Sequence, residues 1–505
     1  MQVKTQLEEL QNYLTDASNM PGGYAERLIV PESEAEIAEA LSDANERKVP
    51  VTISGARTGT VGGAIPFGGT IVSLERLNKI KSIDKDTRRA VVEPGVILSD
   101  FQKAVDAEGL FYPPDPTEWS CQIGGTVATN ASGARSFKYG ATRQFVERIR
   151  VALADGDILE LRRGEVYGGD DGRLRLTASS GREIAARLPT YRRPDVRKNV
   201  SGYFHEMPFD AIDLFIGSEG TLGSITEIEL KLLPKPEGFF SGIVFFERGP
   251  ELLSFVNEAR EMSFRTRRGA KNNVDAAHGP GLDATLIEYF DARALSLISE
   301  KFPETPAGMS GAIFFEQETS AETEDAVFEI WNELLEKHNA DLDLSWFTTN
   351  EQDREKMRGF RHSLPVTVNE RVVRNKQKKI GTDMAVPDEN FPSFLRFYNE
   401  TLDASGIDHV IFGHIGDCHL HANLLPKSDE EAARSRHLYG RFVAQAIMLG
   451  GTVSAEHGIG KLKSKYLNVM MGERYLNEMA DLKRAFDPNW IFGRGNMFAP
   501  AAGKA

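Results

Sequence analysis

The alternation of apolar and polar residues first becomes regular between residues 27 and 53. Two β-type runs, RLIV and VPVTI, flank a segment in which Ile37, Ala40 and Leu41 recur at helical spacing. Ser33 followed by Glu36 forms the residue pair of a capping box, which marks the start of that helix. This stretch therefore predicts a strand, a helix and a second strand.

Further along, the runs VVEPGV at 91–96 and IRVALA at 149–154 predict strands, whereas residues 160–190 are polar and predict an irregular surface excursion. From about residue 237 the pattern changes to longer elements, with GFFSGIVFF followed by PELLSFVNEAREM. The tail from residue 466 is helical and ends in FDPNWIFGRGNMF. We therefore expect an α+β protein with boundaries at 1–236, 237–465 and 466–505.

Composition is that of a globular protein of more than one domain. The 505 residues are 41% apolar and 27% charged, and no run of eighteen apolar residues predicts a membrane span. The N-terminal sequence MQVKTQLEELQNYLTDAS mixes acidic and apolar residues, which predicts an amphipathic helix and not a secretory signal. We expect a cytoplasmic protein, and any membrane contact would be peripheral.

Charge and cysteine content exclude several partners and cofactors. A net charge of -14 argues against nucleic acid as the main partner. The two cysteines, Cys121 and Cys418, are far apart and suit a reducing compartment. Two thiols also cannot supply the four ligands of a cysteine-bound iron–sulfur cluster, so such a cluster would belong to a partner.

Glycine is concentrated in three segments, at 54–69, 113–140 and 217–223. Glycine loops bring several backbone N–H groups against one anion, such as a phosphate or pyrophosphate. They also occur as simple turns between strands. The first loop has neither Walker A spacing nor a GxGxxG pattern, so residue types alone predict anion-binding loops without naming the ligand.

Histidines gather at GHIGDCHLH, residues 413–421, in a chain with only ten histidines. Strand alternation places His419, His421 and Asn423 on one face, and His414 precedes them on a neighbouring strand. The segment SAEHGIG supplies Glu456 and, next to it, a further histidine. Two imidazoles and a carboxylate form a normal zinc shell with one position open, although single histidines are more often structural.

Taken together, these segments resemble the FAD-linked oxidases of the vanillyl-alcohol-oxidase fold. The resemblance is carried by SGARTGTVGGAIPFGG, VVEPGV, DPTEWSCQIGGTVATNASGARSFKYG and LFIGSEGTLGSITEIELKLLP, which occur in the family's order. The later pieces RHSLPVTVN, GHIGDCHLHAN, SAEHGIGKLK and FDPNWIF resemble the branch of D-lactate, glycolate and D-2-hydroxyglutarate dehydrogenases. The resemblance implies a two-part FAD-binding (PCMH-type) domain, an α+β substrate domain that caps it, and a C-terminal helical segment returning to the FAD domain.

The resemblance also implies which residues bind FAD. The first loop would contribute backbone N–H groups to the pyrophosphate, the second would follow the diphosphate, ribityl chain and isoalloxazine, and the third would approach the adenosine and ring. The first loop contains no histidine for a covalent bond, so we expect dissociable FAD. The residues are Ser54, Gly55, Ala56, Arg57, Thr58, Gly59, Pro114, Asp115, Thr117, Gly124, Gly125, Thr129, Ala131, Gly133, Glu219, Gly220, Gly223 and Ile225.

The same comparison assigns metal and substrate roles. The family pattern GHxGDGNxHxN implies that His414, His421 and Glu456 bind a divalent ion, zinc by our expectation, and that Asn423 orients the substrate. Here Cys418 and His419 replace the family's Gly-Asn. His419 could be a fourth ligand, a polar contact to substrate or flavin, or a space-filling residue, and we favour the polar contact.

The implied activity is oxidation of a D-2-hydroxy acid to the 2-oxo acid. His457 is placed to take the hydroxyl proton, and the hydride passes to flavin N5. Arg361 occupies the position where the family binds the substrate carboxylate, unless it forms only a surface salt bridge. Electrons would pass to an electron-transfer flavoprotein, cytochrome, quinone or iron–sulfur subunit, and the sequence is compatible with a homodimer.

Three other functions remain open on sequence alone. One is a metal-independent FAD-linked oxidase of another alcohol or hydroxy acid. The second is a zinc hydrolase in which the histidines and Glu456 activate water and the glycine loops are structural. The third is a flavin-binding electron-transfer subunit without substrate chemistry of its own.

Overall fold

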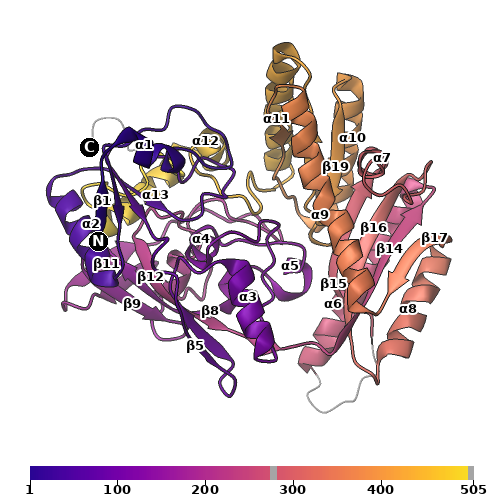
Figure 1. Ribbon diagram of the computed structural model, residues 1–505, viewed down its shortest axis with the longest axis horizontal. Helices are drawn as coiled ribbons and strands as arrows, with labels where there is room; N and C mark the ends of the chain where they lie inside the picture. Colours follow the sequence, from indigo (N-terminus) through magenta and orange to yellow (C-terminus); the bar gives the residue numbers. More distant parts are fainter. Residues whose placement is uncertain (273–280, 499–505) are drawn as a thin grey trace.

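The computed structural model describes residues 1–272 and 281–498, which form two lobes (Figure 1). One lobe contains the N-terminal part of the chain together with the C-terminal helices α12 (Ser464–Met471) and α13 (Glu473–Phe486). The other lobe contains the middle of the chain around a seven-stranded sheet.

The first sheet of the N-terminal lobe has the order β1-β2-β4-β3. Its strands are β1 (Gln2–Lys4), β2 (Arg27–Val30), β4 (Thr70–Ser73) and β3 (Val51–Ser54). Helix α2 (Glu34–Glu46) connects β2 to β3, and the Ser33 side chain accepts a hydrogen bond from the Glu36 backbone N–H. The predicted strand, helix and strand at 27–53 are therefore confirmed.

The prediction of an N-terminal amphipathic helix was wrong over most of its length. Residues Gln2–Lys4 pair antiparallel with β2, and helix α1 covers only Leu7–Leu10, followed by a short 3-10 turn. An exposed β2 edge offers unpaired backbone groups, and the Val3–Ile29 pairing satisfies them. These backbone hydrogen bonds depend on a strand 26 residues away along the chain, and the local sequence pattern does not reveal that strand as a partner.

The second sheet of this lobe has the order β5-β6-β12-β8-β9. Its strands are β5 (Ile80–Asp84), β6 (Arg89–Val92), β12 (Ser224–Lys231), β8 (Val146–Ala152) and β9 (Ile158–Arg162). The expectation of irregular structure at 160–190 was also wrong, because β10 (Arg173–Thr177) and β11 (Glu183–Arg187) form a regular hairpin. Its inward residues Leu174, Leu176 and Ile184 are buried, which is strand alternation within a polar stretch.

The same lobe contains the glycine-rich loops, three helices and one short strand pair. These are α3 (Leu98–Ala107), α4 (Ile123–Thr129), α5 (Ser136–Tyr139) and the short pair of β7 (Leu110–Phe111) with β13 (Leu233–Pro234). After α13 the chain returns to the first sheet, where Phe492 forms a parallel bridge with Val51 of β3. The segment around Phe492 thus lies beside β3, which leads into the first glycine loop.

The sheet of the second lobe has the order β17-β14-β16-β15-β19-β20-β18. Helices α6 (Gly249–Asn272) and α8 (Glu324–Lys337) cover one face, and α7 (Ala292–Ile298) and α9 (Glu351–Arg374) cover the other. Its strands are β17 (Asp341–Thr348), β14 (Gly238–Phe246), β16 (Gly311–Thr319), β15 (Ala284–Asp291), β19 (His409–Gly413), β20 (His421–Leu424) and β18 (Ile380–Gly381).

Alternation along β14 explains how both faces are buried. Ile243 and Phe245 belong to the apolar cluster with α7 and α9, whereas Val244 and Phe246 belong to the cluster with α6 and α8. Helices α10 (Phe391–Ser405) and α11 (Asp429–Met448) pack on each other beyond this sheet. The edge of the sheet formed by β19, β20 and β18 faces the first lobe and carries the histidines.

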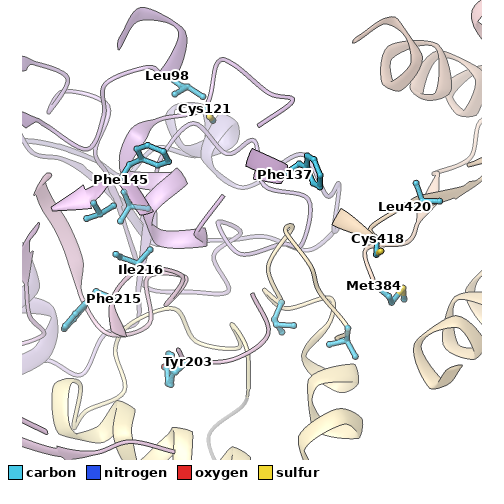
Figure 2. Packing of buried hydrophobic residues seen from close by; sticks show 14 of the residues in the cluster. Leu98, Cys121, Phe137, Phe145, Tyr203, Phe215, Ile216, Met384, Cys418 and Leu420 are labelled. Carbon is cyan, nitrogen blue, oxygen red and sulfur yellow. The ribbon is translucent and has the colours of Figure 1, made fainter. Parts of the chain in front are cut away.

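One apolar cluster continues from the first lobe into the second (Figure 2). It includes Phe145 and Phe215 beneath the glycine loops, and Met384 and Leu420 beside the histidine strands. Cys418 belongs to the same cluster, and burial raises the pKa of its thiol, which keeps it neutral. This shared core fixes the position of the histidine strands relative to the glycine loops.

Candidate active site

A cavity of about 340 Å³ lies where the three glycine-rich loops meet. Two residues of the turn after the histidine strands, Glu456 and His457, also line it. The predicted FAD residues on its wall are Gly55, Ala56, Arg57, Thr58, Gly59, Thr117, Gly124, Gly125, Thr129, Ala131, Glu219, Gly220, Gly223 and Ile225.

Four residues predicted to bind FAD do not line this cavity. Ser54 is buried and accepts a hydrogen bond from Arg57, and the Pro114 carbonyl accepts one from Gln102. Asp115 accepts from the Trp119 indole. Gly133 packs against the backbone of Asp115, where an added Cβ would lie 1.9 Å from the Asp115 carbonyl oxygen. These four residues contact other parts of the loops and do not face the cavity.

The cavity wall suits a large cofactor held by backbone groups. A Cβ added at Gly59 or Gly125 would meet no atom within 4 Å, so both positions present bare backbone to the cavity. At Gly124 the same Cβ would lie 2.5 Å from a side-chain carbon of Pro94, so this glycine lets two loops pack closely. Gln122 lines the cavity, and its buried Oε1 has no hydrogen-bond partner in the described structure. These residues therefore fit FAD.

The histidine cluster is built on the β19–β20 hairpin. Strand β19 ends at Gly413, a 3-10 turn spans Ile415–Asp417, and Cys418 adopts a left-handed conformation with φ of 53° before β20 begins at His421. This tight hairpin brings His414 and His421 toward each other, with ring centroids 5.7 Å apart.

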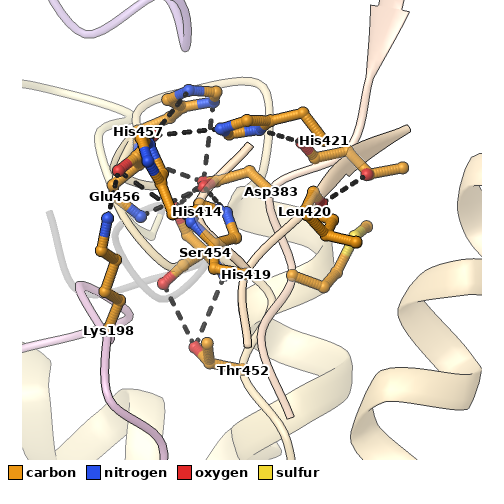
Figure 3. Close-up of polar contacts among 12 residues, drawn as sticks. Lys198, Asp383, His414, His419, Leu420, His421, Thr452, Ser454, Glu456 and His457 are labelled. Carbon is orange, nitrogen blue, oxygen red and sulfur yellow. Dashed lines mark hydrogen bonds and ion pairs between the residues drawn. The ribbon is translucent and has the colours of Figure 1, made fainter. Parts of the chain in front are cut away.

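Glu456 lies between these two imidazoles (Figure 3). Its Oε1 is 3.3 Å from His414 Nε2 and 3.1 Å from His421 Nε2. The opposite nitrogen of each ring also has an oxygen partner: His414 Nδ1 is 2.6 Å from Glu288 Oε1, and His421 Nδ1 is 2.9 Å from the Thr382 carbonyl oxygen. Such partners fix ring orientation, as they do for metal-bound histidines.

Lys198 is a buried cation that sequence reasoning missed. Its Nζ lies 3.2 Å from Glu456 Oε2 and 3.4 Å from Asp417 Oδ2, and it donates to the Gly133 carbonyl at 2.9 Å. Although burial alone would lower the pKa of Lys198, the two carboxylates raise it. They keep the ammonium charged, and no local sequence signal marks it.

Asp383 anchors the turn that carries Glu456 and His457. It is fully buried and accepts the backbone N–H groups of both residues at 3.1 Å and the Lys463 ammonium at 2.5 Å. Burial would raise its pKa, but His457, Lys463 and His419 hold it well below the usual value. The charged carboxylate therefore holds the turn in place.

His457 stands over the cavity with its ring stacked on His421, with centroids 5.1 Å apart and planes 7° from parallel. Burial lowers the pKa of His457 to about 4, against the opposing effect of Asp383. A neutral imidazole at physiological pH is able to accept a proton.

The two predicted substrate residues Arg361 and Asn423 differ in their distance from the cavity wall. Arg361, on α9, donates from Nε to Glu288 at 2.9 Å, and its terminal nitrogen is 3.4 Å from the hydroxyl of Thr117, which lines the cavity. Asn423 is buried away from the cavity wall and donates to the His421 carbonyl at 3.2 Å. Glu288, which joins His414 to Arg361, is a second residue that the sequence did not reveal.

Glu219 connects the third glycine loop to the turn after His457. Its carboxylate accepts the backbone N–H groups of Ile459 at 2.6 Å and Gly460 at 2.7 Å. Burial raises the pKa of Glu219, and the two backbone donors oppose that effect. The cavity wall and the histidine site therefore share this residue.

Comparison with known proteins agrees with this architecture. Residues 25–162 match the FAD binding domain family, and residues 262–497 match the C-terminal domain of the FAD linked oxidases. The chain belongs to the FAD-linked oxidase family, and it is an FAD-dependent oxidoreductase. The zinc hydrolase considered from the histidines is thereby set aside.

Among its relatives, the chain is 30% identical to glycolate oxidase subunit GlcD of Bacillus subtilis, covering 97% of this chain and 93% of the relative. It is 30% identical to D-lactate dehydrogenase of Anaerostipes hadrus, covering 94% and 89%. It is also 26% identical to D-2-hydroxyglutarate dehydrogenase of Stutzerimonas stutzeri, covering 98% and 96%.

Solved structures share the fold at lower identity. An alkyldihydroxyacetonephosphate synthase matches with a TM-score of 0.67 and 16% identity over 97% of this chain and 83% of that one. A 4-ethylphenol oxidase from Gulosibacter chungangensis matches with a TM-score of 0.68 and 16% identity over 99% and 94%. The expected α+β fold of the vanillyl-alcohol-oxidase type is confirmed. Among the described residues, no helix is long and apolar enough to cross a membrane.

Proposed function

We propose that the protein oxidises a D-2-hydroxy acid to the corresponding 2-oxo acid. One observation carries the proposal: Glu456 and His457 line the same cavity as the glycine loops, so a proton acceptor and a candidate metal ligand face the flavin site. The names of the relatives, which include D-lactate and D-2-hydroxyglutarate dehydrogenases, support the substrate class.

In this proposal His414, His421 and Glu456 hold a divalent ion, with zinc as the expected metal. The donor set fits, because two imidazoles and a carboxylate converge and each imidazole has a second partner that orients it. When bound, such an ion lowers the pKa of a hydroxyl group that it contacts, as it does for water.

The proposal assigns proton removal to His457. Its ring is neutral, lies on the cavity wall and is held by stacking on His421. A positioned general base contributes about 10² to 10⁴ in rate. FAD, when bound, takes up the hydride from the substrate carbon.

Arg361 is proposed to bind the substrate carboxylate, because its guanidinium reaches the hydroxyl of Thr117 on the cavity wall. Glu288 neutralises part of that charge and fixes the guanidinium plane. Asn423 supports the site through the His421 backbone in this arrangement. In this proposal the electrons pass to an external acceptor. We also propose that the protein is cytoplasmic.

The test is anaerobic mixing of the FAD- and metal-loaded protein with a panel of D- and L-2-hydroxy acids. The proposal expects at least one D-2-hydroxy acid to bleach the visible flavin absorbance, and its L enantiomer to be much slower. Failure of every hydroxy acid to reduce a flavin that dithionite does reduce would refute it. Reduction by simple alcohols instead would favour the metal-independent oxidase.

A further inference from the structure

His419 stands where the relatives' pattern has asparagine, and its surroundings differ from those of a substrate contact. Its side chain is fully buried, and it is absent from the cavity wall that Glu456 and His457 line. Its ring lies 4.5 Å from His421 and 5.7 Å from His414, measured between centroids. His419 therefore faces the histidine cluster and not the substrate space.

We propose that His419 is a third imidazole ligand of the metal centre, so that His414, His419, His421 and Glu456 hold the ion together. This inference rests on the proposed function, which places a divalent ion at three of these residues. It adds a nitrogen ligand that the relatives' sequence pattern lacks at this position.

The distances among the four residues suit one ion. One donor atom from each lies within 4.8 Å of all the others. Metal–ligand bonds of about 2.0 Å place neighbouring tetrahedral ligands roughly 3.3 Å apart. The contacts from Glu456 to His414 and His421, 3.3 and 3.1 Å, match that edge. His419 Nδ1 is 4.0 Å from Glu456 Oε2, a longer contact that still falls within the 4.8 Å span of the group.

The three imidazoles share one arrangement. In each ring one nitrogen lies toward Glu456, at 3.3 Å for His414, 3.1 Å for His421 and 4.0 Å for His419, and the other nitrogen lies toward an oxygen outside these four residues. For His414 that oxygen is Glu288 Oε1, for His421 it is a backbone carbonyl, and for His419 it is Asp383 Oδ1 at 3.2 Å from Nε2. Carboxylate–histidine–metal chains have this form. His419 thus repeats the arrangement of the two expected ligands.

The hydrogen bonding of His419 supports the same role. Neither of its buried ring nitrogens has a hydrogen-bond partner in the described structure, although Nε2 lies 3.2 Å from Asp383 Oδ1. A buried polar atom without a partner is costly, so a residue serving only to fill this space would be better as an apolar side chain. A metal bond to Nδ1 would satisfy one nitrogen and leave Nε2–H to Asp383.

The surroundings of Glu456 leave room for this extra ligand. Its Oε2 accepts from Lys198 at 3.2 Å and from the Ser132 hydroxyl at 3.1 Å, which leaves Oε1 for the ion. A carboxylate bound through one oxygen occupies one position, so three imidazoles complete a tetrahedral set. Substrate would then add a fifth position, as zinc centres permit. Three nitrogens also favour zinc, cobalt or nickel over magnesium and manganese.

X-ray absorption on the zinc-loaded holoenzyme counts the imidazoles without any mutation. We expect three imidazoles and one oxygen ligand from the protein. The variant His419→Asn, which introduces the asparagine of the family pattern, should lose one imidazole and bind zinc at least tenfold more weakly in competition with a chelator. His437→Asn, at an exposed histidine of α11, is the matched control and should behave as wild type. Retained FAD absorbance shows that each variant is folded.

The outcomes separate the two claims. Zinc bound by two imidazoles in the wild type, or unchanged zinc affinity in His419→Asn, overturns the role of His419 and leaves the proposed function intact. A wild-type protein that binds no zinc, cobalt, manganese or iron overturns both this inference and the metal-assisted part of the proposed function. Three imidazoles in the wild type and two in the variant establish His419 as a ligand.

Discussion

Replacing Glu288 by glutamine should weaken both the fold and the proposed metal site. Glu288 is 2% exposed, and its carboxylate accepts hydrogen bonds from His414 Nδ1 at 2.6 Å and from the Arg361 guanidinium Nε at 2.9 Å. Burial alone would raise the pKa of Glu288, but these two partners lower it to about 2, so it is ionised at neutral pH. Glutamine keeps the shape and removes the charge.

The expected losses of unfolding free energy and of metal affinity in Glu288→Gln follow from its two partners, Arg361 and His414. Removing one member of a buried ion pair costs about 3 to 5 kcal/mol, because the remaining charge stays buried. Among the residues that the structure describes, Arg361 would keep only a 3.4 Å contact with Thr117, so we place the loss of unfolding free energy at about 3 kcal/mol. Loss of the oxygen that orients a ligating histidine weakens metal binding by about 10- to 100-fold.

Urea unfolding and zinc competition against a chelator measure the two effects in the same preparation. Glu300→Gln is a matched control, because Glu300 pairs with Arg371 on the surface of the same lobe and should change stability by less than about 1 kcal/mol. If Glu288→Gln matched this control in stability and kept wild-type zinc affinity, Glu288 would not hold His414 and Arg361 through its charge.

Three more outcomes are expected. Glu219→Gln loses one of two backbone hydrogen bonds to the turn after His457, so flavin should remain bound while its reduction by substrate slows about tenfold or more in stopped flow. Gly125→Val adds a side chain to open cavity space, so circular dichroism should be unchanged while FAD titration shows weaker binding. The Arg162 hydrogen bond is the main cause that lowers the pKa of Glu229 to about 2. The charged Glu229 carboxylate stabilises the fold fully above pH 4.5, and this stabilisation is lost as the pH falls toward 2. In urea unfolding, Glu229→Gln should therefore lower the free energy of unfolding by about 2 kcal/mol at pH 7, and this difference from wild type should vanish as the pH falls from 4.5 toward 2.

Local patterns revealed the elements whose stability is local. The capping pair before α2, the apolar run of β14 and the alternation of β20 are each contained in one short segment. The N-terminal strand and the β10–β11 hairpin were missed because their partners or buried faces lie beyond such a segment. Charged residues between the inward leucines of β10 hid its alternation.

The candidate site divides in the same way. His414 and His421 stand in one hairpin and Glu456 beside His457 in one turn, so sequence alone could group them. Lys198, by contrast, reaches Glu456 from 258 positions away, and Glu288 reaches His414 across 126. Nothing near either residue marks it as part of the site, because only the pairing of β15 with β19 and the meeting of the two lobes bring them there.

The place of His419 could not be settled from alternation. Alternation puts it on the face of His421, and its ring does lie beside that residue. Whether it faces substrate or metal depends on the turn at Cys418 and on Asp383, which comes from another segment. Burial and unpaired nitrogens, which only the structure supplies, favour the metal.

In the proposed reaction, His457 removes a proton from a hydroxy acid that faces the flavin. The direct measurement is the anaerobic rate of flavin reduction by the best D-2-hydroxy acid, in wild type and in His457→Ala with equal FAD and metal content. We expect the variant to be slower by at least about 10²-fold. Equal rates in the two proteins would contradict it.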